Sequence, residues 1–133
     1  MEAWDAWPFA RLYMLLVALA FVVIGVQVLL FHWRAGFRRR TMYGPVLLAP
    51  VIVVAGVVGA LQRDGPLGWI VLSVFALGIF DGLVGIVEHL RGIARRIGGF
   101  SLRNLMSGPP PLLPVAFTAL ALTGVLALVW EAL

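Results

Sequence analysis

One long stretch of the sequence, residues 67–99, is apolar up to a basic end and carries three further ionisable residues, Asp81, Glu88 and His89. An α-helix turns by about 100° per residue, so this spacing places all three on one side of a helix. Several glycines share that side, while the other face carries mainly Leu, Ile, Val and Phe. The face comprises Gly78, Asp81, Gly82, Gly85, Glu88, His89 and Gly92. We therefore expect it to face protein or a ligand rather than lipid.

Asp81 is the residue of this face that most needs a chemical explanation. A carboxylate near the centre of a membrane span is costly, at roughly 2.5–3.5 kcal/mol on insertion scales, and it usually faces a partner. The functional interpretations of Asp81 are a proton relay, a cation site or the counter-ion of a cofactor. The structural alternative is a protonated carboxyl group bonded to a backbone carbonyl or to Ser73, Thr118 or Thr123. The functional readings predict a small dimeric transporter or channel with Asp81 on its ion or proton path.

Two histidines suggest a different chemistry. His32 and His89 each lie two residues before an arginine, which predicts similar depths at the same membrane boundary. Two histidines from different helices can ligate haem b, and a single histidine can hold a chlorophyll-type pigment. Together with Glu88 they also form a 2-His-1-carboxylate metal set. In this alternative the chain is a cofactor-binding membrane protein, and the glycines beside His89 clear space for a flat macrocycle.

The basic residues near His89 have a simpler interpretation. Glu88 and Arg91 are three residues apart on a helix, a spacing that favours an ion pair. Guanidinium groups also bind lipid phosphates in a two-point geometry. We expect contacts to lipid or to a protein partner from Arg38, Arg39, Arg40, Arg95 and Arg96.

The composition defines the elements that must position these residues. The chain has 133 residues, of which 62% are hydrophobic and 12% are charged, and it contains no cysteine. Soluble domains average about 45–50% apolar and about 25% charged residues, so this chain is an integral membrane protein. Cysteine chemistry is excluded, and the basic charge lies beside apolar spans rather than on a nucleic-acid surface. The whole of 1–133 is predicted to form a single membrane domain.

Four apolar runs predict an all-α, antiparallel bundle of four transmembrane helices. The predicted spans are 8–33, 43–61, 67–91 and 112–130, joined on one side by the basic segments 34–42 and 92–111. Pro50 is expected to kink or divide the second span. In the segment 92–111, the pair Gly98-Gly99 predicts a break.

The arginines predict the orientation of the bundle. Of the ten arginines, four lie in residues 34–40 and four in residues 91–103. The positive-inside rule therefore places these segments in the cytoplasm and both termini on the non-cytoplasmic side. The predicted location is the inner (plasma) membrane of a bacterium, with the chain crossing it several times.

Small residues give the leading functional hypothesis. Arg11, Ala18, Gly25 and His32 recur every seven residues and share one face of the first span. Small residues in membrane helices allow close packing. The glycines expected to pack helices together are Gly25, Gly56, Gly59, Gly78, Gly82 and Gly85. We expect a non-catalytic subunit of a larger membrane complex, with lipids and other membrane subunits, or a second copy, as partners.

Recognisable catalytic motifs do not occur in the sequence. It has no HExxH, no P-loop, no Rossmann glycine pattern and no Ser-His-Asp arrangement. The sequence therefore favours a protein that is not an enzyme.

Overall fold

The computed structural model describes residues 9–130, and all regular structure in that part of the chain is helical. Four helices are long and apolar enough to cross a membrane: α1 (Phe9–Arg34), α2 (Tyr43–Leu61), α3 (Gly65–Gly92) and α5 (Leu112–Val129). The predicted spans lie within about two residues of these bounds. The predicted start at residue 8 lies outside the described residues.

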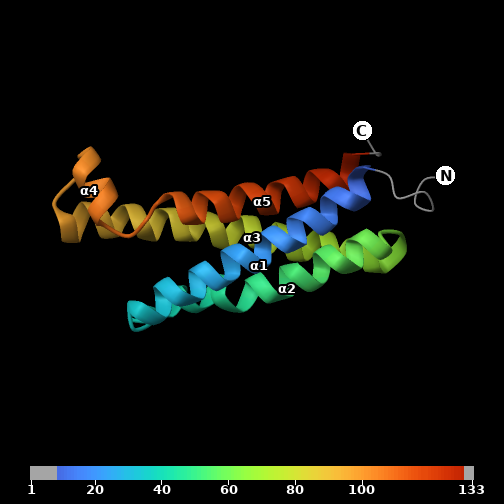
Figure 1. Cartoon of the computed structure of the whole chain (residues 1–133), viewed down its shortest axis with the longest axis horizontal. Coiled ribbons are helices and arrows are strands. Elements are labelled where there is room, and N and C mark those ends of the chain that lie inside the picture. Colours follow the sequence, from blue (N-terminus) through green and yellow to red (C-terminus); the bar gives the residue numbers. More distant parts are fainter. Residues whose placement is uncertain (1–8, 131–133) are drawn as a thin grey trace.

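The four long helices pack as two pairs. Helix α1 lies along α2 and α3 lies along α5, while contacts from α2 to α3 and from α1 to α5 join the pairs (Figure 1). The first turn of α1 and the last turn of α5 lie at one end of the molecule. The segments 34–42 and 91–111, with eight of the arginines, lie at the other, which we call the basic end.

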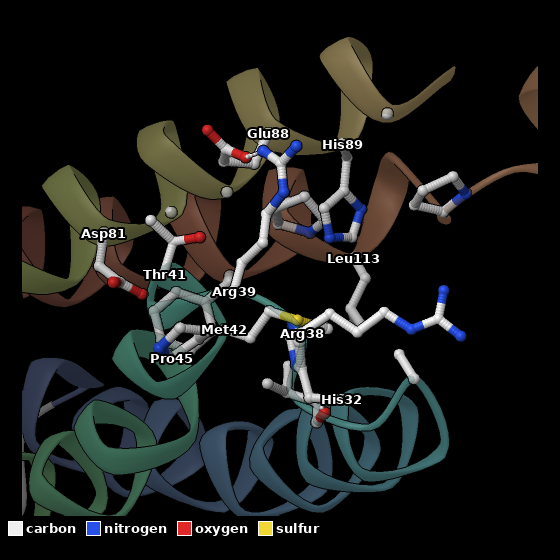
Figure 2. A pocket seen from close by; sticks show the side chains of 18 of the residues that line it. His32, Arg38, Arg39, Thr41, Met42, Pro45, Asp81, Glu88, His89 and Leu113 are labelled. Atoms are coloured by element: carbon white, nitrogen blue, oxygen red, sulfur yellow. Dashed lines mark hydrogen bonds and ion pairs between the residues drawn. The ribbon is translucent and has the colours of Figure 1, made fainter. Parts of the chain in front are cut away.

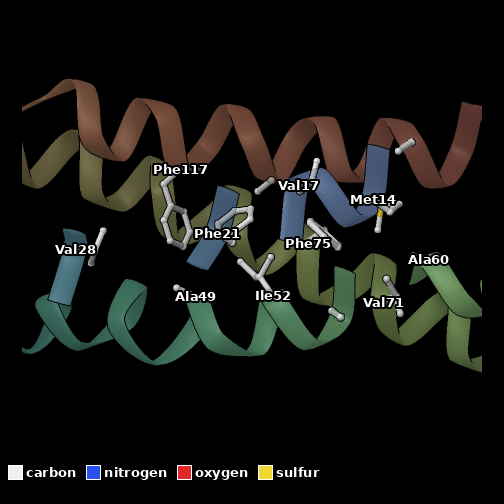
Figure 3. Close-up of a cluster of buried hydrophobic side chains, with 13 residues drawn as sticks. Met14, Val17, Phe21, Val28, Ala49, Ile52, Ala60, Val71, Phe75 and Phe117 are labelled. Carbon is white, nitrogen blue, oxygen red and sulfur yellow. The ribbon is translucent and has the colours of Figure 1, made fainter. Parts of the chain in front are cut away.

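The centre of the molecule is built from aromatic rings. The Phe21 ring of α1 contacts both Phe75 of α3 and Phe117 of α5, with ring centroids 6.4 and 5.0 Å apart (Figure 3). Met14 and Ile52 extend this core along α1 and α2. No polar or charged residue among residues 9–130 is fully buried. Large apolar side chains also cover the outer surface, as a helix set exposed to lipid requires.

Helices α1 and α2 meet along the face of α1 whose residues recur every seven positions, Ala18 and Gly25 among them. A Cβ atom at Gly56 would lie 2.9 Å from the Ala18 Cβ, and one at Gly25 would lie 3.0 Å from the Ala49 Cβ. The backbones can approach this closely only because the contacting residues are small. At the end of this face, the Arg11 Nε donates to the Ala60 carbonyl at 2.6 Å, in the last turn of α2.

The course of α2 at Pro50 and the structure of the segment 92–111 need separate description. Helix α2 continues through Pro50, so the proline does not divide the span. The segment 92–111 is largely helical: a π-helical turn, η2 (Ile93–Ile97), continues α3, and the short helix α4 (Leu102–Ser107) follows. Gly98 and Gly99 separate these two with φ of +98° and +110°, a backbone geometry that favours glycine, so the predicted break occurs there.

Candidate functional site

A cavity of about 290 Å³ opens at the basic end between the two helix pairs (Figure 2). One wall comes from the end of α1, the 35–42 segment and the start of α2. The other comes from the second half of α3, η2 and the start of α5. The ionisable residues that line it are His32, Arg38, Arg39, Asp81, Glu88, His89 and Arg96. The fold therefore brings Asp81, Glu88 and both histidines to one cavity.

Asp81 lies at the inner part of this cavity with an incomplete set of hydrogen bonds. Its Oδ2 atom is buried and has no hydrogen-bond partner among residues 9–130. Gly44, in the first turn of α2, allows the carboxyl group to fit, because a Cβ there would collide with Asp81 Oδ1. A buried acceptor without a partner typically costs about 1–3 kcal/mol, so the group lowers stability as it stands.

The hydroxyl groups named as partners for Asp81 are engaged elsewhere. Ser73 donates to the Trp69 carbonyl, Thr118 to the Pro114 carbonyl and Thr123 to the Leu120 carbonyl, each at 2.8 Å. Each bond stays within the hydroxyl's own helix, which is the usual arrangement for Ser and Thr in apolar helices. A hydroxyl that donates in this way still accepts, but no hydrogen bond joins Asp81 to any of the three hydroxyl oxygens among the described residues.

Both histidines present the same nitrogen atom as a free acceptor. His32 Nδ1 donates to the Val28 carbonyl and His89 Nδ1 donates to the Pro110 carbonyl, each at 2.8 Å. A carbonyl only accepts, so the proton resides on Nδ1 and Nε2 keeps its lone pair in the neutral ring. Neither Nε2 has a partner within residues 9–130.

An aromatic stack holds the His32 ring. Phe37 stacks on His32 with centroids 6.3 Å apart and on Tyr43 with centroids 4.6 Å apart. Phe37 has φ of +45°, which is uncommon for a bulky residue, and it follows Gly36 at φ +74°. This strained turn leads into residues 40–42, which contact α3, and the Phe37 ring covers one face of the imidazole.

Glu88 joins the two walls of the cavity. Its carboxylate forms an ion pair with Arg39 from the opposite wall, and a longer one of 3.5 Å with Arg91 on its own helix. The pairing with Arg91 follows the predicted three-residue spacing. The pairing with Arg39 places that arginine across the opening, as Figure 2 shows, rather than turned outward to lipid.

The remaining arginines of the basic end fall into two groups. Arg38 and Arg96 line the cavity and form no ion pair among the described residues. Arg40 and Arg95, their close neighbours in sequence, do not line it, although all four residues are exposed. The contacts of these arginines to lipid or a partner stay a prediction.

The glycines of α3 pack against other helices of the same chain. A Cβ at Gly78 would lie 2.8 Å from the Ile52 Cδ1 and 3.2 Å from the Ala121 Cβ. One at Gly85 would lie 3.0 Å from the Pro114 Cβ, and one at Gly82 would collide with Thr118. On the side where a Cβ would lie, these glycines therefore serve helix packing, while Gly82 and Gly85 also line the cavity. Space for a flat macrocycle beside them stays a prediction.

The predicted metal site with two histidines and one carboxylate also lacks support in the described residues. His32, Glu88 and His89 line one cavity, yet within residues 9–130 no group of three His, Asp or Glu side chains is placed to hold a metal ion. Glu88 is instead held by arginines. The described residues do not assemble the 2-His-1-carboxylate set.

Comparison with known proteins gives no family to which this geometry can be referred. No family model, no curated protein and no solved structure matches the chain. The function must therefore be argued from the cavity itself.

Proposed function

We propose that this chain is a ligand-binding protein of a bacterial inner membrane, with an antiparallel arrangement of four spans and both termini on the non-cytoplasmic side. The cavity then opens towards the cytoplasm, because it lies at the end that carries eight of the ten arginines. The ligand is a small molecule with a hydrogen-bond donor, and Asp81 is its buried contact.

The observation that carries this proposal is the unpartnered Oδ2 atom of Asp81. Natural proteins leave few buried polar atoms unsatisfied, and those that remain need an explanation. Here the atom belongs to a residue that lines a largely apolar cavity, with Val28, Leu113 and Phe117 among the lining residues. An apolar cavity with a few convergent polar groups is the usual form of a small-molecule site. A bound donor would complete the hydrogen bonding of Asp81.

The same geometry weakens the basis for a purely structural subunit. That hypothesis rested partly on small-residue faces available to partners, together with the arginine segments, but the glycines of α1, α2 and α3 contact helices within the chain. Association with other membrane subunits, or with a second copy, stays a prediction that now depends on the lipid-facing surfaces. Ligand binding has a specific atom to support it, and the subunit role has none.

Native mass spectrometry of the protein released from its own membranes tests ligand binding directly. We expect the wild type to carry a small-molecule adduct that Asp81→Ala loses. Asp64→Ala serves as the matched control, because Asp64 precedes α3 and does not line the cavity, and it should keep the adduct. A wild type without an adduct, or an Asp81→Ala protein that retains it, would overturn the proposal.

A second candidate function is cofactor binding through His32 and His89. It is favoured by one observation, the two Nε2 acceptors left free on a single cavity. Nδ1–H bonded to a backbone carbonyl is also the common arrangement behind a metal-ligating histidine. An absorption spectrum and elemental analysis of the natively isolated protein test it. Haem b or a chlorophyll-type pigment would give colour that His89→Ala removes, whereas a colourless, metal-free sample excludes both.

A further inference from the structure

Two guanidinium groups at the cavity have no counter-ion in the described part of the chain. Arg38 approaches from the segment after α1, and Arg96 from η2 after α3, so they belong to opposite walls. Arg39, the neighbour of Arg38 in sequence, differs from both because Glu88 already neutralises it. Figure 2 shows the Arg38 side chain lying between the helix that carries His32 and the helix that carries His89.

The inner lining has the opposite character. Val28, Pro114 and Phe117 make the deeper wall apolar, and Asp81 precedes Glu88 by seven residues, about 10 Å along the helix. Free cations at an opening and an apolar interior together match a molecule with an anionic head and an apolar body. Guanidinium groups prefer planar or tetrahedral oxyanions such as phosphate, which they bind through paired hydrogen bonds.

We propose that the cavity selects an amphiphile with a phosphate-type headgroup held between Arg38 and Arg96, a pair that we call the phosphate clamp. Its apolar part runs inward along Val28 and Phe117 and ends in a hydrogen-bond donor at Asp81. The inference rests on the proposed ligand-binding function and names the chemical class of that ligand. The cavity volume of about 290 Å³ accommodates a short apolar chain or the proximal part of a longer one. The Arg39–Glu88 pair holds the two walls together beside the headgroup.

Isothermal titration with hexyl phosphate tests the headgroup assignment on the full chain in a non-ionic detergent. We expect saturable binding that Arg38→Gln and Arg96→Gln each weaken about tenfold, the effect of losing one charge-assisted hydrogen bond. Arg40→Gln and Arg95→Gln are matched controls, since they remove the same charge from the same segments outside the cavity. The controls should bind hexyl phosphate like the wild type.

The comparison ligands separate an amphiphile from a free anion. Hexyl phosphocholine, whose phosphate is masked by a bound cation, and inorganic phosphate should both bind at least about tenfold more weakly than hexyl phosphate. Inorganic phosphate binding equally well would overturn the amphiphile assignment. Equal losses in all four arginine variants would indicate a general charge effect and would overturn the clamp, as would no loss in any of them.

The two proposals fail in different ways. A native adduct that is lost in Asp81→Ala but retained in both Arg38→Gln and Arg96→Gln would leave the ligand-binding function intact and overturn the headgroup class. A wild type without a native adduct, combined with arginine-dependent binding of hexyl phosphate, would overturn the function while supporting the phosphate clamp.

Discussion

Side chains fill the space between all four long helices at the end that carries the first turn of α1 and the last turn of α5, whereas a cavity opens at the basic end. At the filled end, a Cβ on Gly59 of α2 would lie 2.9 Å from Met14 of α1, 3.1 Å from Val71 of α3 and 3.5 Å from Leu128 of α5. Met14 and Val71 are no more than 1% exposed. At the basic end, polar groups from both walls face a space that the chain itself leaves unfilled.

The difference distinguishes the end of the molecule that stabilises the fold from the end whose polar groups are available to a ligand. Close packing of small and apolar residues is the main source of helix association in membranes, so the filled end holds the four helices together. The basic end keeps an unpartnered acceptor on Asp81, which lowers stability without a ligand. It also carries two exposed arginines, Arg38 and Arg96, that form no ion pair among the described residues. Because side chains fill the bundle at the other end, the cavity does not continue through the molecule. This favours a binding site over an open channel. Three substitutions and one double-mutant cycle test this contrast, with stability measured as the free energy of unfolding during SDS titration from mild detergent.

Phe75→Ala should produce the largest effect. The ring fits against Gly124 of α5 and Phe21 of α1 and is completely buried, so its removal leaves a void worth about 3–5 kcal/mol of unfolding free energy. Phe80→Ala, on the same helix but 68% exposed, should change stability little. Similar losses for the two variants would contradict the assignment of Phe75 to the packed core.

Gly82→Ala tests whether the glycines of α3 serve packing. The added methyl group would lie 3.1 Å from the Thr118 Cα, a backbone atom that cannot rotate away, so α3 and α5 must separate. We expect a loss of about 1–3 kcal/mol, typical of overpacking. Ala76→Met, which adds volume on an exposed side of α3, is the control. A Gly82→Ala variant as stable as the wild type would mean that the space beside Gly82 is free.

Asp81→Ala should change stability in the opposite direction. Removing a buried acceptor that has no partner removes its desolvation cost, so the variant should gain about 1–3 kcal/mol while it loses the native adduct. A gain in stability with a loss of binding is the expected signature of a residue kept for function. A clear loss of stability instead would show that Asp81 has a structural partner in the membrane.

The ion pair between Arg39 and Glu88 should have the smallest effect. Both side chains are partly exposed, and exposed pairs contribute about 0.2–1 kcal/mol, so the coupling energy in a double-mutant cycle should fall in that range. The cycle compares Arg39→Gln, Glu88→Gln and the double variant. Zero coupling would remove the pair as a link between the two walls.

Much of the fold follows from features that the sequence displays directly. Span lengths are set by hydrophobic runs, and the break at Gly98-Gly99 and the pairing of Glu88 with Arg91 follow from local backbone and helix geometry. The sequence also places His32 and His89 near the ends of α1 and α3, and both line the cavity. Each of these features depends only on residues that lie close together in the sequence.

The site required the tertiary structure. The pairing of Arg39 with Glu88 joins residues 49 positions apart, and His89 bonds to Pro110 across the end of α3, neither of which periodicity indicates. The support of His32 by Phe37 depends on an uncommon positive φ that the sequence pattern did not predict. Each of these depends on how far apart two helices end and how their connecting segments turn.

The sequence by itself determined a membrane protein with four apolar helices and one polar helix face, because hydrophobic length and helical periodicity are encoded residue by residue. Only the tertiary structure decided what that face meets. It directed the glycines to neighbouring helices, engaged Ser73, Thr118 and Thr123 within their own helices, and left Asp81 at a cavity without a partner. The rotation and spacing of packed helices set those contacts, and both are properties of the assembled set rather than of any one helix.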